Sequence, residues 1–176
     1  MKPRGLVVRA ALEQDLPFLR KMLYEAANRP GAPWPAFEVS MEEARNRRFW
    51  SGWMRVGDIG VVAEDDAVPV GAAWIRRFAG EELSAIDDPE VPVLAIAVER
   101  DYRGCGVGGL LMDALIEHAR ASGISAISLT TGLFNDAAVR LYRSRQRVGS
   151  RADHARFPAL GGRTADLACA VAGTTR

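Results

Sequence analysis

The stretch Val98-Glu99-Arg100-Asp101-Tyr102-Arg103-Gly104-Cys105-Gly106-Val107-Gly108-Gly109 is the most informative part of the chain. It follows an apolar run at residues 93–98 and precedes residues 107–122, where apolar side chains recur at helical spacing. The pattern predicts a strand, a glycine-rich turn and a helix in direct succession. Because glycine lacks a Cβ, such a turn can direct several N–H groups and the helix N-terminus at one anion. With the charge of Arg103 at its entrance, the segment suits a pyrophosphate.

Outward from this turn, the chain alternates strand and helix patterns. The apolar run at 93–98 is nearly continuous, which is typical of a strand covered on both faces. Ser40 and Glu43 form a capping-box pattern that predicts the start of a helix reaching Trp53. The order predicts an α/β layered fold with helices on the sheet faces. Strands are expected at residues 6–9, 59–64, 70–76, 93–98, 124–131, 148–152 and 164–171, and the other helices at 12–28, at 107–122 and after Asn135.

Composition restricts the class of protein. The chain has 176 residues, with 23 basic against 22 acidic side chains and a net charge of +1, so one domain spanning residues 1–176 is expected. The charge balance argues against a general nucleic-acid binder, and no apolar run is long enough for a membrane span. Residues 6–8 are too few for a signal-peptide core. Cys105 and Cys169 give neither a disulfide framework nor a zinc spacing. A cytoplasmic protein without a metal is expected.

The glycine turn admits two interpretations. Residues 104–109 match the dinucleotide pattern G-x-G-x-x-G, which by itself is weak evidence. A dinucleotide site also needs an acidic residue near the end of the next strand to bind a ribose. That strand ends Leu129-Thr130-Thr131-Gly132, with no acid, and several elements precede the motif instead of one strand. A nucleotide-binding oxidoreductase is therefore the weaker interpretation.

The same segment resembles the acetyl-CoA loop of the GNAT acetyltransferase superfamily, Q/R-x-x-G-x-G/A, with Arg103, Gly106 and Gly108 in the pattern. The resemblance continues in residues 135–142, Asn-Asp-Ala-Ala-Val-Arg-Leu-Tyr, which look like the family's N-x-x-A-x-x-L-Y signature. It implies a mixed, mostly antiparallel central sheet with a splayed strand at the acetyl-CoA site and helices on both faces. The chain departs from the family at Arg145-Gln146-Arg147, where a Gly-Phe pair is common, and at Arg100, where proline is common.

The resemblance implies direct transfer of an acetyl group from the cosubstrate acetyl-CoA to an amine, without a metal. The backbone of the splayed strand would pair with the pantetheine arm and polarise the thioester carbonyl. The glycine turn would bind the pyrophosphate, Asn135 would contact the pantetheine, and Tyr142 would protonate the departing thiolate. The cofactor-binding positions implied in this way are Ile96, Ala97, Val98, Arg103, Gly104, Gly106, Val107, Gly108, Asn135 and Tyr142, and the catalytic one is Tyr142.

Each of these residues also has a plainer interpretation. Tyr142 could be a core aromatic, Arg103 a solvated charge and Asn135 only a helix N-cap. Cys105 is interpreted as a small loop residue and His118 as an ordinary helix residue. Core packing is expected for most of Trp34, Trp50, Trp53 and Trp74. The general base stays open among Glu99, Glu81, Glu82, Asp87, His154 and water.

Charge is segregated along the chain. Residues 78–98 carry five acids and no base, whereas residues 140–163 carry seven arginines and the single acid Asp153. The acidic segment would favour a cationic acceptor through its local field, or it is simply a solvated loop. A small-molecule or peptide amine is the expected acceptor, with no nucleic acid or membrane partner and a possible homodimer by family analogy. A non-catalytic acyl-CoA binding module is the alternative function.

Overall fold

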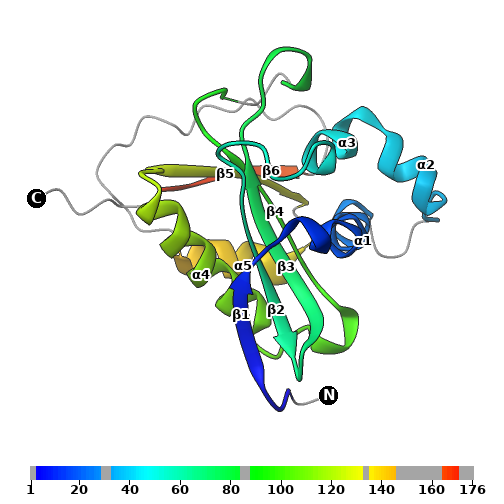
Figure 1. Ribbon diagram of the computed structural model, residues 1–176, viewed down its shortest axis with the longest axis vertical. Coiled ribbons are helices and arrows are strands. Elements are labelled where there is room, and N and C mark those ends of the chain that lie inside the picture. Colours follow the sequence, from blue (N-terminus) through cyan, green and yellow to red (C-terminus); the bar gives the residue numbers. More distant parts are fainter. Residues whose placement is uncertain (1–2, 29–32, 84–87, 133–134, 146–163, 171–176) are drawn as a thin grey trace, which may run out of the picture.

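A computed structural model describes residues 3–28, 33–83, 88–132, 135–145 and 164–170 of the chain (Figure 1). Six strands form one sheet in chain order: β1 (Leu6–Ala10), β2 (Ile59–Asp65), β3 (Val68–Arg76), β4 (Val93–Val98), β5 (Ala126–Gly132) and β6 (Thr164–Ala170). β4 and β5 are parallel, and the other neighbouring pairs are antiparallel. The expected mixed, mostly antiparallel sheet is thus confirmed. The strand expected at 148–152 lies outside the described residues.

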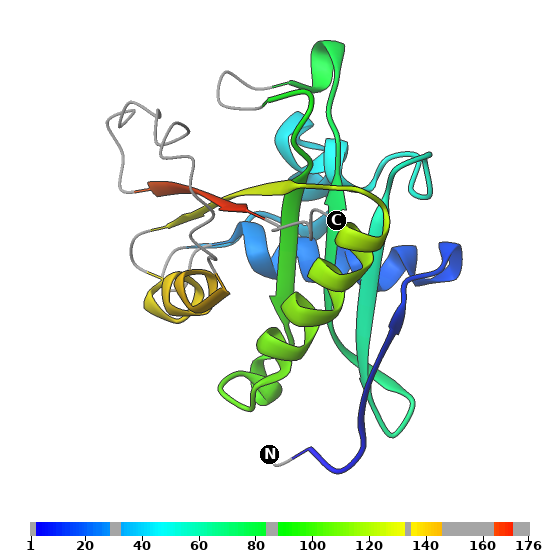
Figure 2. The ribbon, with the colours of Figure 1, turned by 90° about the vertical axis from the view of Figure 1, so that its left-hand side faces the viewer.

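Helices cover both faces of this sheet (Figures 1 and 2). They are α1 (Leu16–Ala27), α2 (Phe37–Glu42), α3 (Ala44–Trp50), α4 (Val107–Ala121) and α5 (Asp136–Arg145), with 3-10 turns η1 (Glu13–Asp15), η2 (Gly80–Glu82) and η3 (Arg100–Tyr102). The first three helices pack on one face, and α4 and α5 pack on the other. The layered arrangement expected from the order of elements is confirmed.

Two apolar cores, one on each face, hold the layers together. Side chains alternate along β2, so Val61 packs toward α4 while its neighbour Val62 packs toward α1. On the α1 side, Leu19 and Met22 are 1% and 0% exposed. Burying one such side chain contributes about 1.5–3 kcal/mol. β4 contributes to both cores, which confirms a strand covered on both faces.

A tight hairpin joins β2 to β3. Its two connecting residues, Asp66 and Ala67, both have positive φ, 51° and 64°, which is the backbone form that matches the twist of paired strands. The strands pair from Asp65 and Val68 onward, so only two residues connect them. The expected strands at 59–64 and 70–76 left a longer connection, residues 65–69. The hairpin therefore brings the start of β3 close to the end of β4.

The expected capping box at Ser40 and Glu43 is wrong. Ser40 lies inside α2 and is buried, while Glu43 is extended and separates α2 from α3. The reason is a tertiary contact: the buried Asn46 side chain donates from Nδ2 to Ser40 O at 2.8 Å. This bond holds two short helices at an angle where the local pattern predicted one continuous helix.

The tryptophans serve mainly to pack the α1 side of the sheet. Trp53 and Trp74 are 8% and 0% exposed, and Trp50 packs against the same core. Their indole N–H groups donate to Leu12 O, Phe49 O and Met41 O, respectively. The expectation of a packing role is confirmed for these three.

β4 and β5 separate along their length. Val93 with Ser128 is the pairing that joins them in the described residues, and Ser128 N donates to Pro92 O at the same end. Beyond this point β5 and β6 turn away from the rest of the sheet, which Figure 2 shows plainly. The expected splay is confirmed. On its other edge β4 stays paired with β3, in regular register from Gly71–Val98 to Arg76–Val93.

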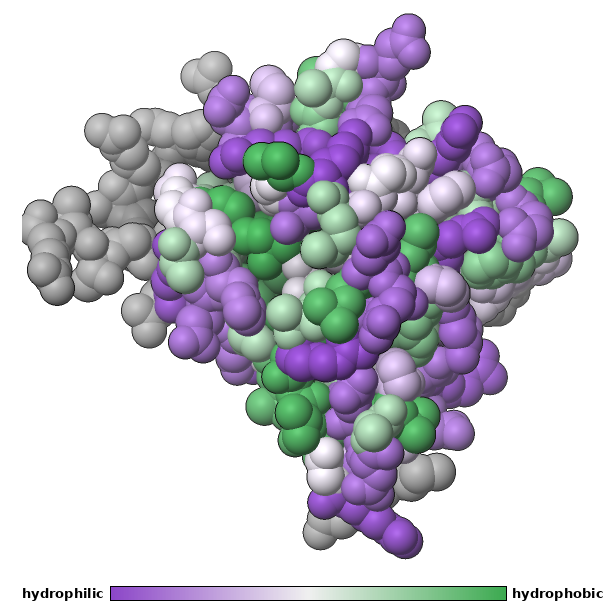
Figure 3. Space-filling model, viewed as in Figure 1, coloured by the Kyte–Doolittle hydropathy of each residue, from purple (hydrophilic) through white to green (hydrophobic). Residues whose placement is uncertain are grey.

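Hydrophilic side chains cover most of the face seen in Figure 3, and hydrophobic ones form separate small patches. Among the described residues, no helix is long and apolar enough to span a membrane. The large exposed apolar side chains lie on different elements: Val7, Leu12, Val39, Met54, Val56, Val68 and Leu110.

Candidate active site

The splay leaves backbone groups of β4 without strand partners. Glu99 N donates to Val70 O, so these two residues are a hydrogen-bonded pair of the antiparallel β3–β4 ladder. Hydrogen-bonded and non-hydrogen-bonded pairs alternate along such a ladder. In that alternation Ala97 directs its N–H and C=O toward β3, whereas Ile96 and Val98 direct theirs toward the side from which β5 has departed. Of the three expected positions, two therefore present backbone groups to the opening.

The glycine turn at the end of β4 presents free donors. Gly104 and Gly106 have φ of 77° and 86°, a region that L side chains rarely adopt. Within the described part of the chain, no acceptor is recorded for the N–H groups of Gly104, Gly106, Val107 and Gly108, while Cys105 N donates to Tyr102 O. These four donors lie where α4 begins, so the turn and the helix N-terminus form one anion-binding feature.

Two glycine substitutions test this backbone geometry. Gly106→Ala should lower the free energy of unfolding by about 1–2 kcal/mol, because its φ of 86° is strained for alanine. Gly108→Ala should be neutral or stabilising, since Gly108 lies in the helix and a Cβ there would meet Leu141 Cδ2 at an ordinary 3.4 Å. Urea unfolding of both variants measures the difference. Equal stabilities would contradict the strained turn.

α5 packs beside this turn. Asn135 Oδ1 accepts from Ala138 N at 3.1 Å, which confirms Asn135 as the N-cap of the helix. A Cβ on Gly108 would lie 3.4 Å from Leu141 Cδ2 and 3.9 Å from Val98 Cγ2. The fold therefore brings the end of β4, the start of α4 and one face of α5 together, although they are distant in sequence.

Tyr142 lies on α5 within the core that α4 shares with the sheet. Its side chain is 8% exposed. Burial raises the pKa of the Tyr142 phenol to about 12, because the charged phenolate is poorly solvated there. The phenol is therefore neutral at physiological pH and can act as a proton donor but not as a base.

Arg103 projects from the turn toward α1. Its Nε donates to Val98 O at 3.0 Å, and its Nη2 pairs with Glu25 Oε2 at 3.0 Å. The Arg103 side chain is 45% exposed, so it is accessible to a ligand. Sequence reasoning missed Glu25, which carried no signal beyond its place in a helical pattern.

The segment before Arg103 is anchored to the hairpin. Tyr102 Oη donates to Asp65 Oδ2 at 3.2 Å, and Asp65 Oδ1 accepts from the backbone N–H of Gly5 and Arg4. The bonds from Gly5 and Arg4 keep the pKa of the Asp65 carboxyl below its usual range. The carboxylate therefore stays charged and holds the segment before the glycine turn against the end of β2.

The base candidates that the structure describes lie on separate segments. Glu99 pairs with Lys21 at 2.5 Å, and Glu82 pairs with Arg55 at 2.9 Å. Glu81 lies in η2, on the loop that joins the far end of β3 to β4. Asp87 and His154 are outside the described residues. His118 is exposed on α4, and Cys105 is half-buried in the turn.

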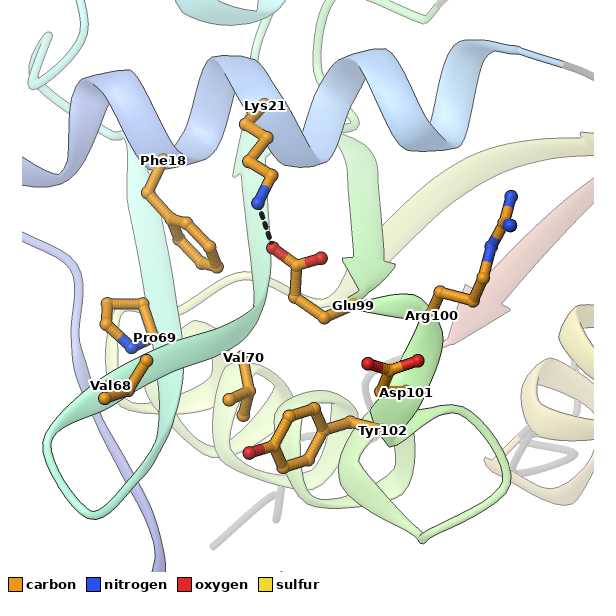
Figure 4. A pocket seen from close by; sticks show the side chains of 9 residues that line it. All are labelled: Phe18, Lys21, Val68, Pro69, Val70, Glu99, Arg100, Asp101 and Tyr102. Carbon is orange, nitrogen blue, oxygen red and sulfur yellow. Dashed lines mark hydrogen bonds and ion pairs between the residues drawn. The ribbon is translucent and has the colours of Figure 1, made fainter. Parts of the chain in front are cut away.

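A pocket of about 540 Å³ adjoins the end of β4, between α1, the β2–β3 hairpin and η3 (Figure 4). The Lys21–Glu99 ion pair crosses one side of it, and Phe18 and Pro69 lie on the opposite side. The remaining lining residues are Val68, Val70, Arg100, Asp101 and Tyr102. Its walls combine apolar and charged groups next to the glycine turn. No cluster of metal-binding side chains occurs among the described residues.

One departure from the family pattern has a structural account. Arg145 ends α5 and pairs with Asp113 of α4 through Nε and Nη2, at 3.0 and 3.1 Å. A Cβ on Gly109 would come within 2.6 Å of Arg145 Nη2, so the absence of a side chain at position 109 leaves room for the Arg145 guanidinium. Arg145 thus fixes α5 against α4. Gln146 and Arg147 lie outside the described residues.

Comparison with solved structures places this fold among acetyltransferases. A structure of YncA from Salmonella typhimurium, described as a putative acetyltransferase with its cofactor acetyl-CoA, aligns over 98% of both chains with a TM-score of 0.65 and 17% identity. A ribosomal-protein-alanine N-acetyltransferase from Brucella melitensis aligns over 78% of this chain and 82% of that chain, with a TM-score of 0.54 and 27% identity.

Sequence relatives agree with the structural ones. N-alpha-acetyltransferase RimI of Mycobacterium tuberculosis is 33% identical over 68% of this chain and 65% of its own length. Mycothiol acetyltransferase of Propionibacterium freudenreichii is 32% identical over 59% of this chain. The chain spans only 31% of that relative's length. The model of the acetyltransferase (GNAT) family matches residues 20–146, which include the glycine turn and α5. The chain therefore belongs to the GNAT acetyltransferase family.

Proposed function

We propose that the chain transfers an acetyl group from acetyl-CoA to a primary amine of a small molecule or peptide, by direct attack of the amine on the thioester. The observation that carries the proposal is the splay of β4 from β5, which ends at the glycine turn, where four N–H groups have no acceptor among the described residues. A pantetheine arm fits a strand edge whose backbone is free, and a pyrophosphate fits the donors beyond it. In CoA the pantetheine arm is joined to the pyrophosphate, and the free edge of β4 leads into the glycine turn in the same order.

In this proposal the backbone of β4 binds and orients the thioester. The N–H and C=O groups of Ile96 and the N–H of Val98 face the opening, so they can pair with the amides of the pantetheine arm, whereas Val98 O accepts from Arg103 Nε. A backbone N–H there can also donate to the thioester oxygen as negative charge develops on it. The terminal amide of Asn135 lies at the start of α5 and would contact the same arm.

In the proposed reaction Tyr142 is the general acid, and the proton that it gives up is replaced by one from the amine. The nitrogen–carbon bond forms as the amine attacks, and the carbon–sulfur bond then breaks. The Tyr142 phenol gives its proton to the departing thiolate and recovers one from the attacking nitrogen through water. Its raised pKa, about 12, keeps the donor protonated before each turnover.

The names of the relatives support both acceptor classes. An N-alpha-acetyltransferase and a ribosomal-protein-alanine N-acetyltransferase are named for protein amines, whereas mycothiol acetyltransferase is named for a small molecule. Two of the described acids of residues 78–98 have partners within the chain. Glu82 pairs with Arg55, and Asp88 Oδ1 accepts from Glu90 N.

A thiol-release assay tests the proposal. The full chain is mixed with acetyl-CoA and a panel of small primary amines and peptides with free amino termini. Release of CoA thiol that depends on one acceptor class supports acetyl transfer. Protection from thermal unfolding by acetyl-CoA without release on any amine would instead support the binding module. Protection by NAD and not by acetyl-CoA would overturn both.

Arg103→Ala should weaken CoA binding by about 10- to 100-fold, because a hydrogen bond to a charged group is worth about 1.5–3 kcal/mol. The fold should be retained, since Arg103 is 45% exposed. Titration calorimetry with CoA measures the affinity. Arg120→Ala is the matched control, because Arg120 is an exposed arginine in the last turn of α4, at the opposite end of that helix from the glycine turn. Equal CoA affinities in both variants would contradict the role given to Arg103.

A further inference from the structure

Two ion pairs of opposite polarity join α1 to the segment after β4. Lys21 Nζ pairs with Glu99 Oε1, and four residues later on both segments Glu25 Oε2 pairs with Arg103 Nη2. Figure 4 shows the Lys21–Glu99 pair reaching across from the helix to the end of the strand. Residues four apart on a helix share a face, so α1 presents a cation and then an anion to this segment.

The second pair fixes the direction of the Arg103 side chain. Besides Glu25, the guanidinium binds Val98 O through Nε at 3.0 Å. Val98 O is one of the carbonyl groups that the β3–β4 ladder leaves facing the opening. Arg103 therefore lies over the end of β4, and its Nε occupies one of the carbonyl groups at the opening.

Glu25 also changes the charge that an incoming anion meets. With a carboxylate oxygen 3.0 Å from its Nη2, Arg103 presents little net positive charge to a pyrophosphate. The carboxylate itself repels the same ligand. Because the two side chains are 45% and 21% exposed, solvent reduces both effects to the size of a partly exposed ion pair.

We propose that Glu25 competes with CoA for Arg103: its carboxylate holds the guanidinium over the end of β4 until the pyrophosphate of CoA replaces it as the partner. The inference rests on the proposed function, because it takes CoA as the ligand of the glycine turn. It assigns a role in cosubstrate binding to α1, which otherwise serves to cover the sheet. No bond is made or broken other than hydrogen bonds and ion pairs.

The test is a double-mutant cycle measured by titration calorimetry with CoA. Glu25→Gln should bind CoA about two to five times more tightly than the unmodified chain, the range set by one partly exposed ion pair. The gain should disappear when Arg103 is already alanine. Glu25→Asp, which keeps the charge, should return the affinity toward that of the unmodified chain. The gain should also shrink as salt is raised, because screening weakens the competing carboxylate.

Glu117→Gln is the matched control for loss of one negative charge. Glu117 is exposed on α4, ten residues beyond the first residue of that helix, or about 15 Å along its axis. This exceeds the screening length at physiological salt, so its CoA affinity should not change.

Two results separate this inference from the proposed function. If Arg103→Ala weakens CoA binding and Glu25→Gln leaves it unchanged or weaker, the role of Glu25 is overturned and the proposed function stands. If the gain from Glu25→Gln persists in the Arg103→Ala background, Glu25 acts on CoA by charge alone and its competition for Arg103 is overturned. If Arg103→Ala leaves CoA affinity unchanged, the cosubstrate site itself is misplaced.

Discussion

Tyr142→Phe should lower kcat for acetyl transfer by about 10²- to 10⁴-fold, the usual contribution of a positioned general acid. The affinity for CoA should change little. The phenyl ring keeps the packing of a side chain that is only 8% exposed, and no hydrogen bond of the phenol is recorded in the described part of the chain. Steady-state kinetics with saturating acetyl-CoA, together with CoA titration, separates the two effects.

The pH dependence provides a second check on Tyr142. Its pKa is raised to about 12, so the protonated donor persists well above neutral pH. The Tyr142-dependent part of kcat should therefore not decline between about pH 7 and pH 10. A loss of activity in that range that is absent from Tyr142→Phe would show a phenol ionising much earlier than burial allows.

Tyr102→Phe is the matched control for Tyr142. Tyr102 precedes the glycine turn, and its phenol donates to Asp65, so the substitution removes a structural hydrogen bond. It should lower stability by about 0.5–1.5 kcal/mol, the worth of an ordinary hydrogen bond, and leave kcat within a few-fold. An unchanged kcat in Tyr142→Phe would leave Tyr142 as a core aromatic and remove the acid from the mechanism.

Arg76→Met should destabilise the fold by about 3–5 kcal/mol, because it leaves the buried Asp58 carboxylate without its cation. The Arg76 and Asp58 side chains are 0% and 3% exposed and lie 2.6 Å apart. All five N–H donors of Arg76 are used, two on Asp58 and three on the carbonyls of Arg48, Ser51 and Gly52. Arg76 thus ties the end of β3 to the segment that follows α3.

Thermal unfolding measures this loss. For a chain of this size, 1 kcal/mol shifts Tm by about 2–4 °C, so a decrease of roughly 6–20 °C is expected. Arg55→Met is the matched control, because the Arg55–Glu82 pair is 39% and 31% exposed and should contribute about 0–1 kcal/mol. Equal shifts in Tm for the two variants would show that Arg76 is an ordinary surface charge.

The sequence predicted the centre of the fold well because local physics decides it. The unbroken apolar run of residues 93–98 predicts a buried strand, the four glycines within residues 104–109 predict a turn, and β4 is observed at Val93–Val98 as expected. α4 begins at Val107 as expected and is followed by Gly123 with φ of 75°, a conformation that ends helices. The donors of the turn could be anticipated because glycine adopts φ of 77° and 86° at little steric cost, whereas other residues rarely do.

The rest depends on contacts between distant segments. A lone arginine at the end of a strand looks solvent-exposed, so nothing in the sequence marked Arg76 as buried by partners 18 to 28 residues away. The break between α2 and α3 depends on the buried Asn46 side chain, not on the local capping pattern. The pairing of Lys21 and Glu25 with the segment after β4 spans 78 residues, beyond the reach of helical periodicity.

The most direct test is to measure CoA thiol release and acetylated amine in the same reaction, with the best acceptor from the panel. Acetyl transfer predicts one acetylated amine for each thiol released, a rate that falls by two orders of magnitude or more in Tyr142→Phe, and weaker CoA binding in Arg103→Ala. Thiol release without an acetylated amine, or the same rates in the Tyr142→Phe variant as in the unmodified chain, would contradict this account.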